Sequence, residues 1–225
     1  MKAGGFPLGS DTMALADFVR LRTGEAVCDL GCGGGALGLL LCAAEPSCRV
    51  TGVELDETAC IIAADNFAQT ALNGRCTLVP GDLREIRSLL PAGAFSAAVS
   101  NPPYFPAASP ASPEPARAAA RSESGCSLDA LCAAASWVLR NRGRFFLTYR
   151  AERLCALVCA LRRHGLEPKR LRPVRHRPGS PVKLLLLEAR KGGGQGLAFE
   201  PELLFYGPDG QPTAEYRRIY HEGDD

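Results

Sequence analysis

The sequence predicts an α/β fold in which one parallel sheet carries helices on both faces. Apolar segments of strand length alternate with helical segments along most of the chain, an order typical of doubly wound sheets. Early in the chain an apolar segment leads into the glycine-rich stretch 31–35, and a segment rich in Ala and Leu follows it. Of the 225 residues 46% are hydrophobic and 22% are charged, so residues 1–225 are expected to form a single domain that buries its own core.

Strands and helices alternate through the first hundred residues. The strand segments are short and apolar, and one helical segment begins with acidic residues near the positive end of its dipole. Residues 1–24 are expected to form an N-terminal extension that holds a short leading helix. The expected elements are a helix over 12–19, a strand over 26–30, a helix over 36–44, a strand over 49–54, a helix over 57–71, and strands over 77–80 and 95–100.

The second half of the chain continues this alternation and ends with two strands that are expected to run antiparallel to each other. One helical segment is amphipathic, with Leu154, Val158 and Leu161 on one face. The last two strands are expected to pair as an antiparallel hairpin at the edge of the sheet, and residues 192–225 follow as a C-terminal tail. The expected elements are helices over 128–139 and 151–164 and strands over 144–149, 166–174 and 182–189.

The positive charges of the chain are concentrated in one segment. The net charge is only +2, yet residues 140–177 hold 12 Lys and Arg against 2 Asp and Glu. One interpretation is a solvated helix face followed by a loop. The other is a surface that contacts nucleic-acid phosphates, because clustered cations release condensed counterions there. The candidate contacts are three arginines in or beside the loop of the expected hairpin, Arg172, Arg175 and Arg177.

The ten cysteines are expected to be small core residues rather than a disulfide framework or a metal site. They lie in apolar runs such as those around Cys42 and Cys155. The sequence has no C-x-x-C pair and three histidines, so we expect no metal ion. No segment has the roughly 20 apolar residues of a membrane span, so we expect a protein that binds no membrane. The first residues lack the hydrophobic core of an export signal, so we expect a cytoplasmic protein.

The glycine-rich stretch is the first candidate site. Gly31, Gly33 and Gly35 allow a tight turn and a close approach of the backbone to a ligand, beside the N-terminus of the following helix. Asp29 lies in the strand just before the turn; it either accepts backbone N–H groups of the turn or faces the amino-acid end of a cofactor. A glycine-rich turn alone also occurs in nicotinamide enzymes, so it indicates a nucleotide cofactor without naming one.

Two acids at the ends of the next strands extend this candidate site. Glu54 ends the second strand about 20 residues beyond the turn, where an acid binds both ribose hydroxyls of a nucleotide. The alternative for Glu54 is a solvated strand end. Asp82 ends the third strand and is placed to accept a hydrogen bond from an adenine amino group, or else to cap the helix that begins at Leu83.

The second candidate site is the tetrad Asn101-Pro102-Pro103-Tyr104, which follows the fourth expected strand. The lone pair of a planar amino group is delocalised; the Asn101 side-chain oxygen and the Pro102 carbonyl can each accept one of its hydrogens and direct the lone pair toward a methyl donor. Pro102 and Pro103 restrict the backbone, and Tyr104 offers a ring on which a base can stack. An ordinary Asn-Pro turn is the alternative. The turn and the tetrad together predict methyl transfer from S-adenosylmethionine to nitrogen. Positioning and alignment of the two reactants for an in-line displacement are expected to carry much of the reduction of the reaction barrier.

Five further segments extend the pattern over nearly the whole chain. They are Gly9-Ser10-Asp11-Thr12-Met13-Ala14-Leu15-Ala16-Asp17-Phe18, Ala120-Arg121-Ser122-Glu123, Gly143-Arg144-Phe145-Phe146, Ala151-Glu152-Arg153-Leu154 and Leu166-Glu167-Pro168-Lys169-Arg170-Leu171. With the two motifs, these segments resemble the bacterial tRNA1(Val) adenine-N(6) methyltransferase family. The resemblance implies a Rossmann-like class I methyltransferase sheet with an antiparallel C-terminal hairpin, and methylation of an adenosine beside the tRNA anticodon. It places Gly31, Gly33, Glu54 and Asp82 around S-adenosylmethionine and residues 101–104 around the base, with Asn101 next to the cofactor as well.

Two other functions remain open on the residues alone. A glutamine methyltransferase acting on protein release factors uses the same tetrad, because the lone pair of a carboxamide nitrogen is delocalised in the same way. Such enzymes resemble a longer chain with an N-terminal helical domain. A non-catalytic RNA-binding module with this fold is the other alternative, and the intact turn and tetrad argue against it. We therefore expect S-adenosylmethionine as cofactor, tRNA as partner, no metal and a monomer.

Overall fold

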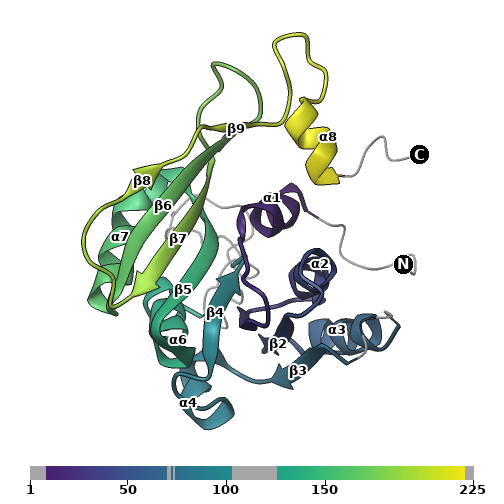
Figure 1. The fold of residues 1–225 in the computed structure, drawn as a ribbon, viewed down its shortest axis with the longest axis vertical. Coiled ribbons are helices and arrows are strands. Elements are labelled where there is room, and N and C mark those ends of the chain that lie inside the picture. The colour runs from purple at the N-terminus through teal and green to yellow at the C-terminus, as the bar shows by residue number, and fades with distance from the viewer. Residues whose placement is uncertain (1–8, 70–71, 73, 103–125, 221–225) are drawn as a thin grey trace, which may run out of the picture.

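The computed structural model describes residues 9–69, 72, 74–102 and 126–220, and a single sheet runs through its centre (Figure 1). The strands in these ranges are β1 (Ala26–Leu30), β2 (Arg49–Glu54), β3 (Cys76–Pro80), β4 (Phe95–Ser100), β5 (Leu139–Arg150), β6 (Leu166–Arg175), β7 (Leu184–Lys191), β8 (Ala198–Phe199) and β9 (Leu203–Leu204). They are hydrogen bonded in the order β3-β2-β1-β4-β5-β7-β6-β8, and β9 also pairs with β6.

The first five strands are parallel and the hairpin is antiparallel. β1 pairs in parallel with β2 and β4, which in turn pair with β3 and β5. The carboxyl ends of these strands therefore meet at one edge of the sheet. β7 is antiparallel to both β5 and β6, which confirms the predicted fold class and the C-terminal hairpin. The parallel pairing of β8 and β9 with β6 was not predicted, since strands of two residues leave no periodic signal.

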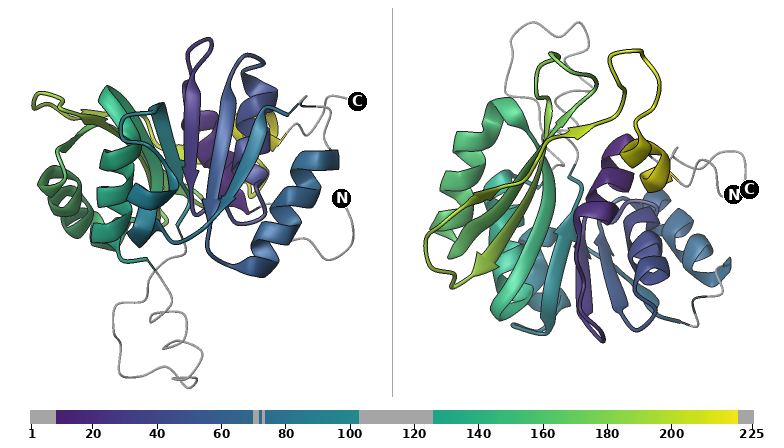
Figure 2. Two further views of the ribbon diagram at one scale, coloured as in Figure 1. Left: turned by 90° about the horizontal axis from the view of Figure 1, so that it is seen from below. Right: turned by 45° about the horizontal axis from the view of Figure 1, so that its top comes forward.

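Helices cover both faces of this sheet, as the two views of Figure 2 show. On one face α1, α2, α3 and α8 contribute to a core that includes Val27; on the other, α4, α6 and α7 pack on a core that includes Cys28. Neighbouring strand residues serve different cores because their side chains alternate between the two faces. In the part of the chain that is described, no helix has the length and apolarity to cross a membrane. The helices are α1 (Ser10–Phe18), α2 (Ala36–Ala44), α3 (Glu57–Gln69), α4 (Ile86–Leu89), α6 (Leu128–Val138), α7 (Leu154–Arg163) and α8 (Ala214–Tyr220), with short 3-10 helices η1 (Leu83–Glu85) and η2 (Ala151–Arg153).

The predicted elements agree closely with this structure where the local pattern is strong. β1, α2, β2 and β4 have the predicted bounds. The prediction missed α4 and α8 and began β5 five residues late, and it included a helix starting at Leu83, where η1 lies, only as the alternative role of Asp82. Arg142, near the start of β5, has a φ of 64°, a rare conformation for a residue with a side chain, and it interrupts the apolar pattern from which strands are recognised.

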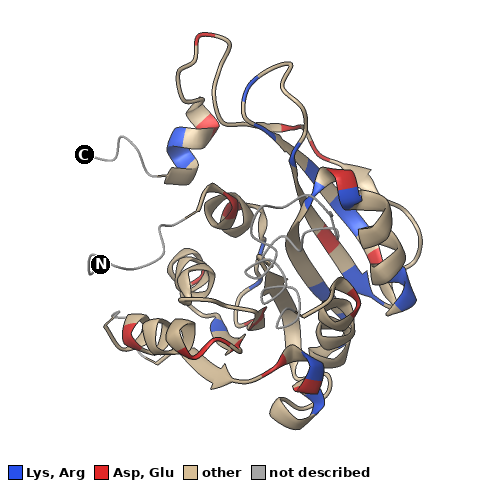
Figure 3. Cartoon of the chain, turned by 180° about the vertical axis from the view of Figure 1, so that it is seen from behind, with Lys and Arg blue, Asp and Glu red and all other residues tan. Residues whose placement is uncertain are grey.

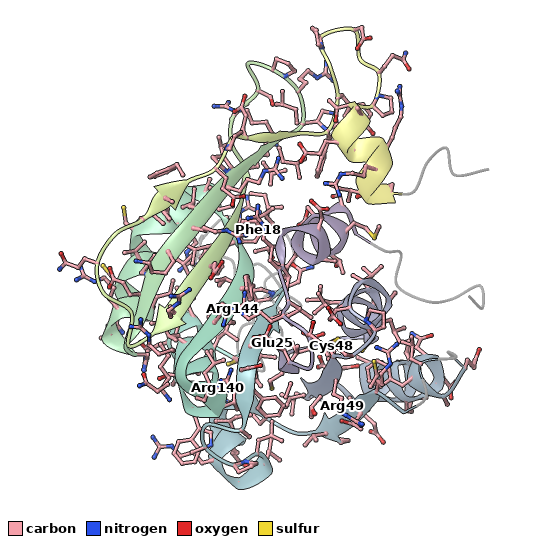
Figure 4. All side chains as sticks on the ribbon, viewed as in Figure 1. Phe18, Glu25, Cys48, Arg49, Arg140 and Arg144 are labelled. Carbon is pink, nitrogen blue, oxygen red and sulfur yellow. The ribbon has the colours of Figure 1, made fainter. Side chains whose placement is uncertain are left out.

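The described parts of the two terminal segments, residues 9–24 and 192–220, pack against the rest of the molecule. Leu15 and Phe18 of α1, and Leu203 and Ile219 near the C-terminus, belong to one core. A buried ion pair between Arg144 of β5 and Glu25 adds to this anchoring, with 2.5 Å between Nη2 and Oε2 (Figure 4). The same guanidinium donates to the Arg20 carbonyl. The segment that leads from α1 into β1 is therefore held against the middle of the sheet.

The expectation that the cysteines are core residues is wrong for two of them. Cys155 and Cys159 are exposed on α7, whereas most of the other cysteines are buried. α7 buries Leu157, Ala160 and Leu161. At about 100° per residue, Cys155 and Cys159 lie roughly 160° around the helix from Leu157, on the solvent side. The helical period, not the apolar composition of the run, decides which of these residues is buried.

Candidate active site

The turn between β1 and α2 is shaped by glycines in the left-handed region. Gly31, Gly33 and Gly35 have φ angles of +74°, +53° and +80°, which L side chains rarely adopt. A Cβ at Gly35 would lie 2.5 Å from the Phe67 ring, so that glycine is required by packing. A Cβ at Gly31 or Gly33 would meet nothing within 4 Å. The backbone of the turn at these two positions thus borders open space that a ligand can approach closely.

Glu54 ties the end of β2 to this turn. One carboxylate oxygen accepts the Gly33 N–H at 2.8 Å, and the other accepts the N–H groups of Leu55 and Asp56 at 2.9 Å each. A carboxylate has about four lone-pair sites, so capacity remains for a ribose hydroxyl. The Leu55 side chain is apolar, 49% exposed and directly follows Glu54. The sequence did not predict an exposed apolar side chain beside Glu54, because a single apolar residue such as Leu55 after a strand forms no periodic pattern.

Asp29 is buried just beneath the turn and is incompletely partnered. Its side chain accepts a backbone N–H from Gly38 in the first turn of α2, but Oδ2 has no hydrogen-bond partner although Asp29 is only 1% exposed. Burial, followed by the nearby Glu54 charge, raises the pKa of Asp29 to about 7. An unsatisfied buried carboxylate oxygen is costly. The site therefore fits a ligand with a cationic amino group, as S-adenosylmethionine has at its amino-acid end.

Asp82 caps the short helix that follows β3. Its Oδ1 accepts the Arg84 N–H and its Oδ2 accepts the Arg84 guanidinium, with 2.8 Å to N and to Nε. These contacts, the guanidinium first, lower the pKa of Asp82. The capping interpretation of Asp82 is therefore seen directly, whereas contact with adenine stays a prediction. Asp82 still lies near Glu54, because the N–H of Gly81, the residue before Asp82, donates to the Glu54 carbonyl at 2.8 Å.

Asn101 stands at the end of β4, one strand away from the glycine turn. Its Nδ2 donates to Thr12 Oγ1 of α1 at 3.0 Å, and its Oδ1 accepts from Thr148 Oγ1 of β5 at 2.5 Å. Thr148 is fully buried. The preceding residue, Ser100, donates to the Leu30 carbonyl at 2.7 Å and so joins the end of β4 to the end of β1. The Asn101 amide is thus held from two sides next to the candidate cofactor site.

The structure brings most of the predicted site residues to one edge of the sheet. Pro102 is buried beside Asn101, while Pro103 and Tyr104 lie outside the described residues. The sequence prediction did not include Thr12 or Thr148. A usable signal was present for Thr148, which is a polar residue in the otherwise apolar run 145–149 near the carboxyl end of a strand.

The basic segment spans several elements of the fold. Its cations are spread over β5, α7 and the hairpin, with acids among them (Figure 3). Arg172 Nη2 donates to both carboxylate oxygens of Glu215, at 2.7 and 2.8 Å, and the Arg172 side chain is 12% exposed. Arg175 pairs with Glu202 at 2.6 Å. Within the described ranges, Arg177 has no ion pair and is exposed in the loop after β6. The predicted RNA contacts of these three arginines stay predictions, and two of them are already bound to acids of the C-terminal segment.

The chain is similar to methyltransferases along most of its length. Residues 8–153 match the methyltransferase small domain family. A tRNA1(Val) (adenine(37)-N6)-methyltransferase of Porphyromonas gingivalis is 32% identical over 85% of this chain and 76% of its own. A protein of the same name from Aeromonas hydrophila is 28% identical over 94% of this chain and 87% of its own. Another from Dickeya chrysanthemi is 33% identical over 83% and 73%.

Solved structures share the fold at lower sequence identity. A protein of Agrobacterium tumefaciens described as a predicted O-methyltransferase is 20% identical and matches with a TM-score of 0.78 over 94% of this chain and 95% of its own. TrmN from Thermus thermophilus is 18% identical and has a TM-score of 0.56 over 80% of this chain and 48% of its own. At such identities the likeness concerns the fold alone.

Proposed function

Because the chain belongs to the methyltransferase small domain family and groups with tRNA1(Val) (adenine(37)-N6)-methyltransferases, we propose that it transfers the methyl group of S-adenosylmethionine to the exocyclic amino nitrogen of an adenosine in tRNA. The observation that supports this most is the Asn101 amide, which is held by Thr12 and Thr148 at the edge of the sheet beside the glycine turn. An acceptor of fixed orientation suits a planar amino group that must be aligned with a methyl donor.

The residues of the turn have defined tasks in this proposal. When bound, S-adenosylmethionine supplies an electrophilic methyl group. Gly31 and Gly33 let the ligand lie close to the backbone, and Glu54 accepts its ribose hydroxyls. The unpartnered oxygen of Asp29 would accept from the amino group of the ligand. Together these residues would hold and orient the methyl donor.

Asn101 and Pro102 act on the nucleophile. The Asn101 Oδ1 and the Pro102 carbonyl each accept one hydrogen of the adenine amino group, which directs the nitrogen lone pair toward the methyl carbon. The new carbon–nitrogen bond forms as the carbon–sulfur bond breaks, and the nitrogen then releases one proton to water. Because the nitrogen becomes positive during this step, acceptors aimed at its hydrogens stabilise the transition state more than the ground state.

The relatives favour adenosine over a protein glutamine as the substrate. The three relatives compared above carry a name that specifies adenine 37 of tRNA1(Val), and they cover 83% to 94% of this chain. We extend this proposal to the adenosine beside the anticodon of that tRNA. A release-factor peptide that carries the acceptor glutamine remains the best competing substrate for a direct test.

The test is a methylation assay with unmodified tRNA transcripts followed by mass spectrometry of the nucleosides. N6-methyladenosine is expected beside the anticodon of tRNA1(Val) and in no release-factor peptide. Asn101→Ala should lower the single-turnover rate about a hundredfold or more, with S-adenosylmethionine affinity unchanged. Methylation of the peptide but not of any tRNA would overturn the proposal.

A further inference from the structure

A cavity lies at the same edge of the sheet as Asn101. It has a volume of about 400 Å³ and lies between α1, the loop joining β6 to β7, and the segment after β9. Its apolar wall is formed by Val174, Pro181, Leu184 and Phe205. This volume falls within the usual range of sites for small organic ligands, which are mostly apolar with a few polar groups.

The cavity is next to the catalytic amide, on the side away from the cofactor residues. Asp11, which lines it, directly precedes Thr12, the partner of Asn101. Leu184, which also lines it, pairs with Arg150 at the end of β5, just beyond Thr148. In the sheet order β2-β1-β4-β5-β7-β6, Asn101 at the end of β4 therefore lies between the cofactor residues at the ends of β1 and β2 and the cavity beside β7 and β6.

Two cations that the protein leaves available lie at this cavity or beside it. Lys183 lines the cavity, whereas Arg177 directly follows the lining residue His176 in the same loop. Arg177 and Lys183 lie in the β6–β7 loop and are exposed, and neither makes an ion pair with any described residue. Arg175, which also borders the cavity, is paired with Glu202. The cations free to meet a phosphate are thus Arg177 and Lys183 rather than Arg172 and Arg175.

Aromatic side chains continue from the cavity along the same end of the molecule. His176 lines the cavity and contacts Tyr206, with 4.7 Å between ring centroids. The Tyr206 N–H donates to the His176 carbonyl at 2.9 Å, so the β6–β7 loop and the segment before α8 lie side by side at the top of Figure 1. Exposed rings with cations beside them are the features that bind unstacked bases of single-stranded RNA.

We propose that this cavity binds the nucleotide adjoining the target adenosine, with its base against Phe205 and His176 and its phosphate at Arg177 and Lys183. The inference rests on the proposed function, since it assumes an RNA substrate at Asn101. A loop nucleotide suits the site because its base is flat and largely apolar on its faces, while its phosphate is anionic. The cavity would thereby position the RNA so that the target base reaches the amide.

The first experiment removes the available cations and measures tRNA binding over a range of salt concentrations. Arg177→Ala with Lys183→Ala should weaken binding and reduce the slope of log affinity against log salt by about 1.4–1.8, because two phosphate contacts are lost. The matched control is Arg49→Ala with Arg140→Ala, two arginines at the opposite edge of the sheet (Figure 4). An unchanged slope in the loop variant, or an equal change in the control, would overturn the phosphate contacts.

The second experiment tests the base with a tRNA stem-loop that has an abasic nucleotide beside the target. For the intact stem-loop, His176→Ala should raise KM several-fold and leave kcat unchanged. With the abasic stem-loop, the wild-type protein should show the raised KM and His176→Ala should add nothing further. Independent, multiplying effects of the two changes would overturn the assignment. A wild-type protein that methylates no tRNA would instead contradict the proposed function itself.

Discussion

The Glu54 carboxylate accepts the Gly33 N–H at 2.8 Å, so the acid at the end of β2 and the turn after β1 form one unit. The two residues are 21 positions apart in the chain. The same carboxylate also accepts the next two N–H groups of its own strand end. The acid proposed to bind the ribose therefore also sets the conformation of the turn that approaches the rest of the ligand.

Glu54→Ala should weaken S-adenosylmethionine binding by about 1–3 kcal/mol, because the ribose hydroxyls lose a charged acceptor and the turn loses its support. Isothermal titration calorimetry measures the affinity. The control is Glu57→Ala, which removes an exposed acid from the first turn of α3. Wild-type affinity in the Glu54 variant would show that the ribose is bound elsewhere.

Thr148→Val should reduce kcat by about two- to tenfold, because one hydrogen bond to the Asn101 Oδ1 is lost and the amide is held less firmly. The affinity for S-adenosylmethionine should not change. Thr148→Ser retains the hydroxyl and should restore most of the rate. If the serine variant is as slow as the valine variant, the effect comes from packing and not from the hydrogen bond.

Gly35→Ala and Gly33→Ala should differ in what they damage. At Gly35 the added Cβ would lie 2.5 Å from Phe67 and the φ is +80°, so the free energy of unfolding should fall by more than about 1 kcal/mol. At Gly33 only the backbone is strained, but the Cβ enters the open space beside the turn. Both substitutions strain the backbone, so urea denaturation should show a loss of stability for each and the larger loss for Gly35→Ala, while calorimetry should show lost cofactor affinity for Gly33→Ala. Equal stability of the two variants would contradict this division.

The buried Asp29 carboxyl predicts a pH dependence of stability. Its pKa is raised from 3.8 to about 7 by burial and by the Glu54 charge, so the folded protein binds this proton more tightly than the unfolded chain does. This contribution to the free energy of unfolding is fully present below about pH 4 and is lost as the pH rises toward 7. Asp29→Asn should remove that part of the pH profile, as measured by denaturation at several pH values. A profile identical to that of the wild type would show that Asp29 does not titrate in this range.

Much of the candidate site was predictable because its residues belong to local patterns. The strand at 26–30, the glycine turn and the acid at the end of the next strand follow each other within about 30 residues, and their spacing reflects one strand–turn–helix unit. The position of Asn101 after β4 was predictable for the same reason. Backbone conformation and strand length, which these patterns report, depend mainly on neighbours in the chain.

The partners of these residues depended on contacts that no local pattern encodes. Asn101 is held by Thr12, which is 89 positions away, and by Thr148, which is 47 positions away. Arg172 has a basic neighbourhood in sequence, yet its guanidinium is bound by Glu215, 43 positions further on.

The sequence by itself determined the fold class and the alternation of strands and helices, and it predicts which residues hold a nucleotide cofactor and an amino group. Only the tertiary structure decided how the Asn101 amide is oriented and which cations remain available for RNA. The physical reason is that hydrogen bonds and ion pairs between side chains depend on distances of a few ångströms across the sheet. Those distances are set when distant segments pack together.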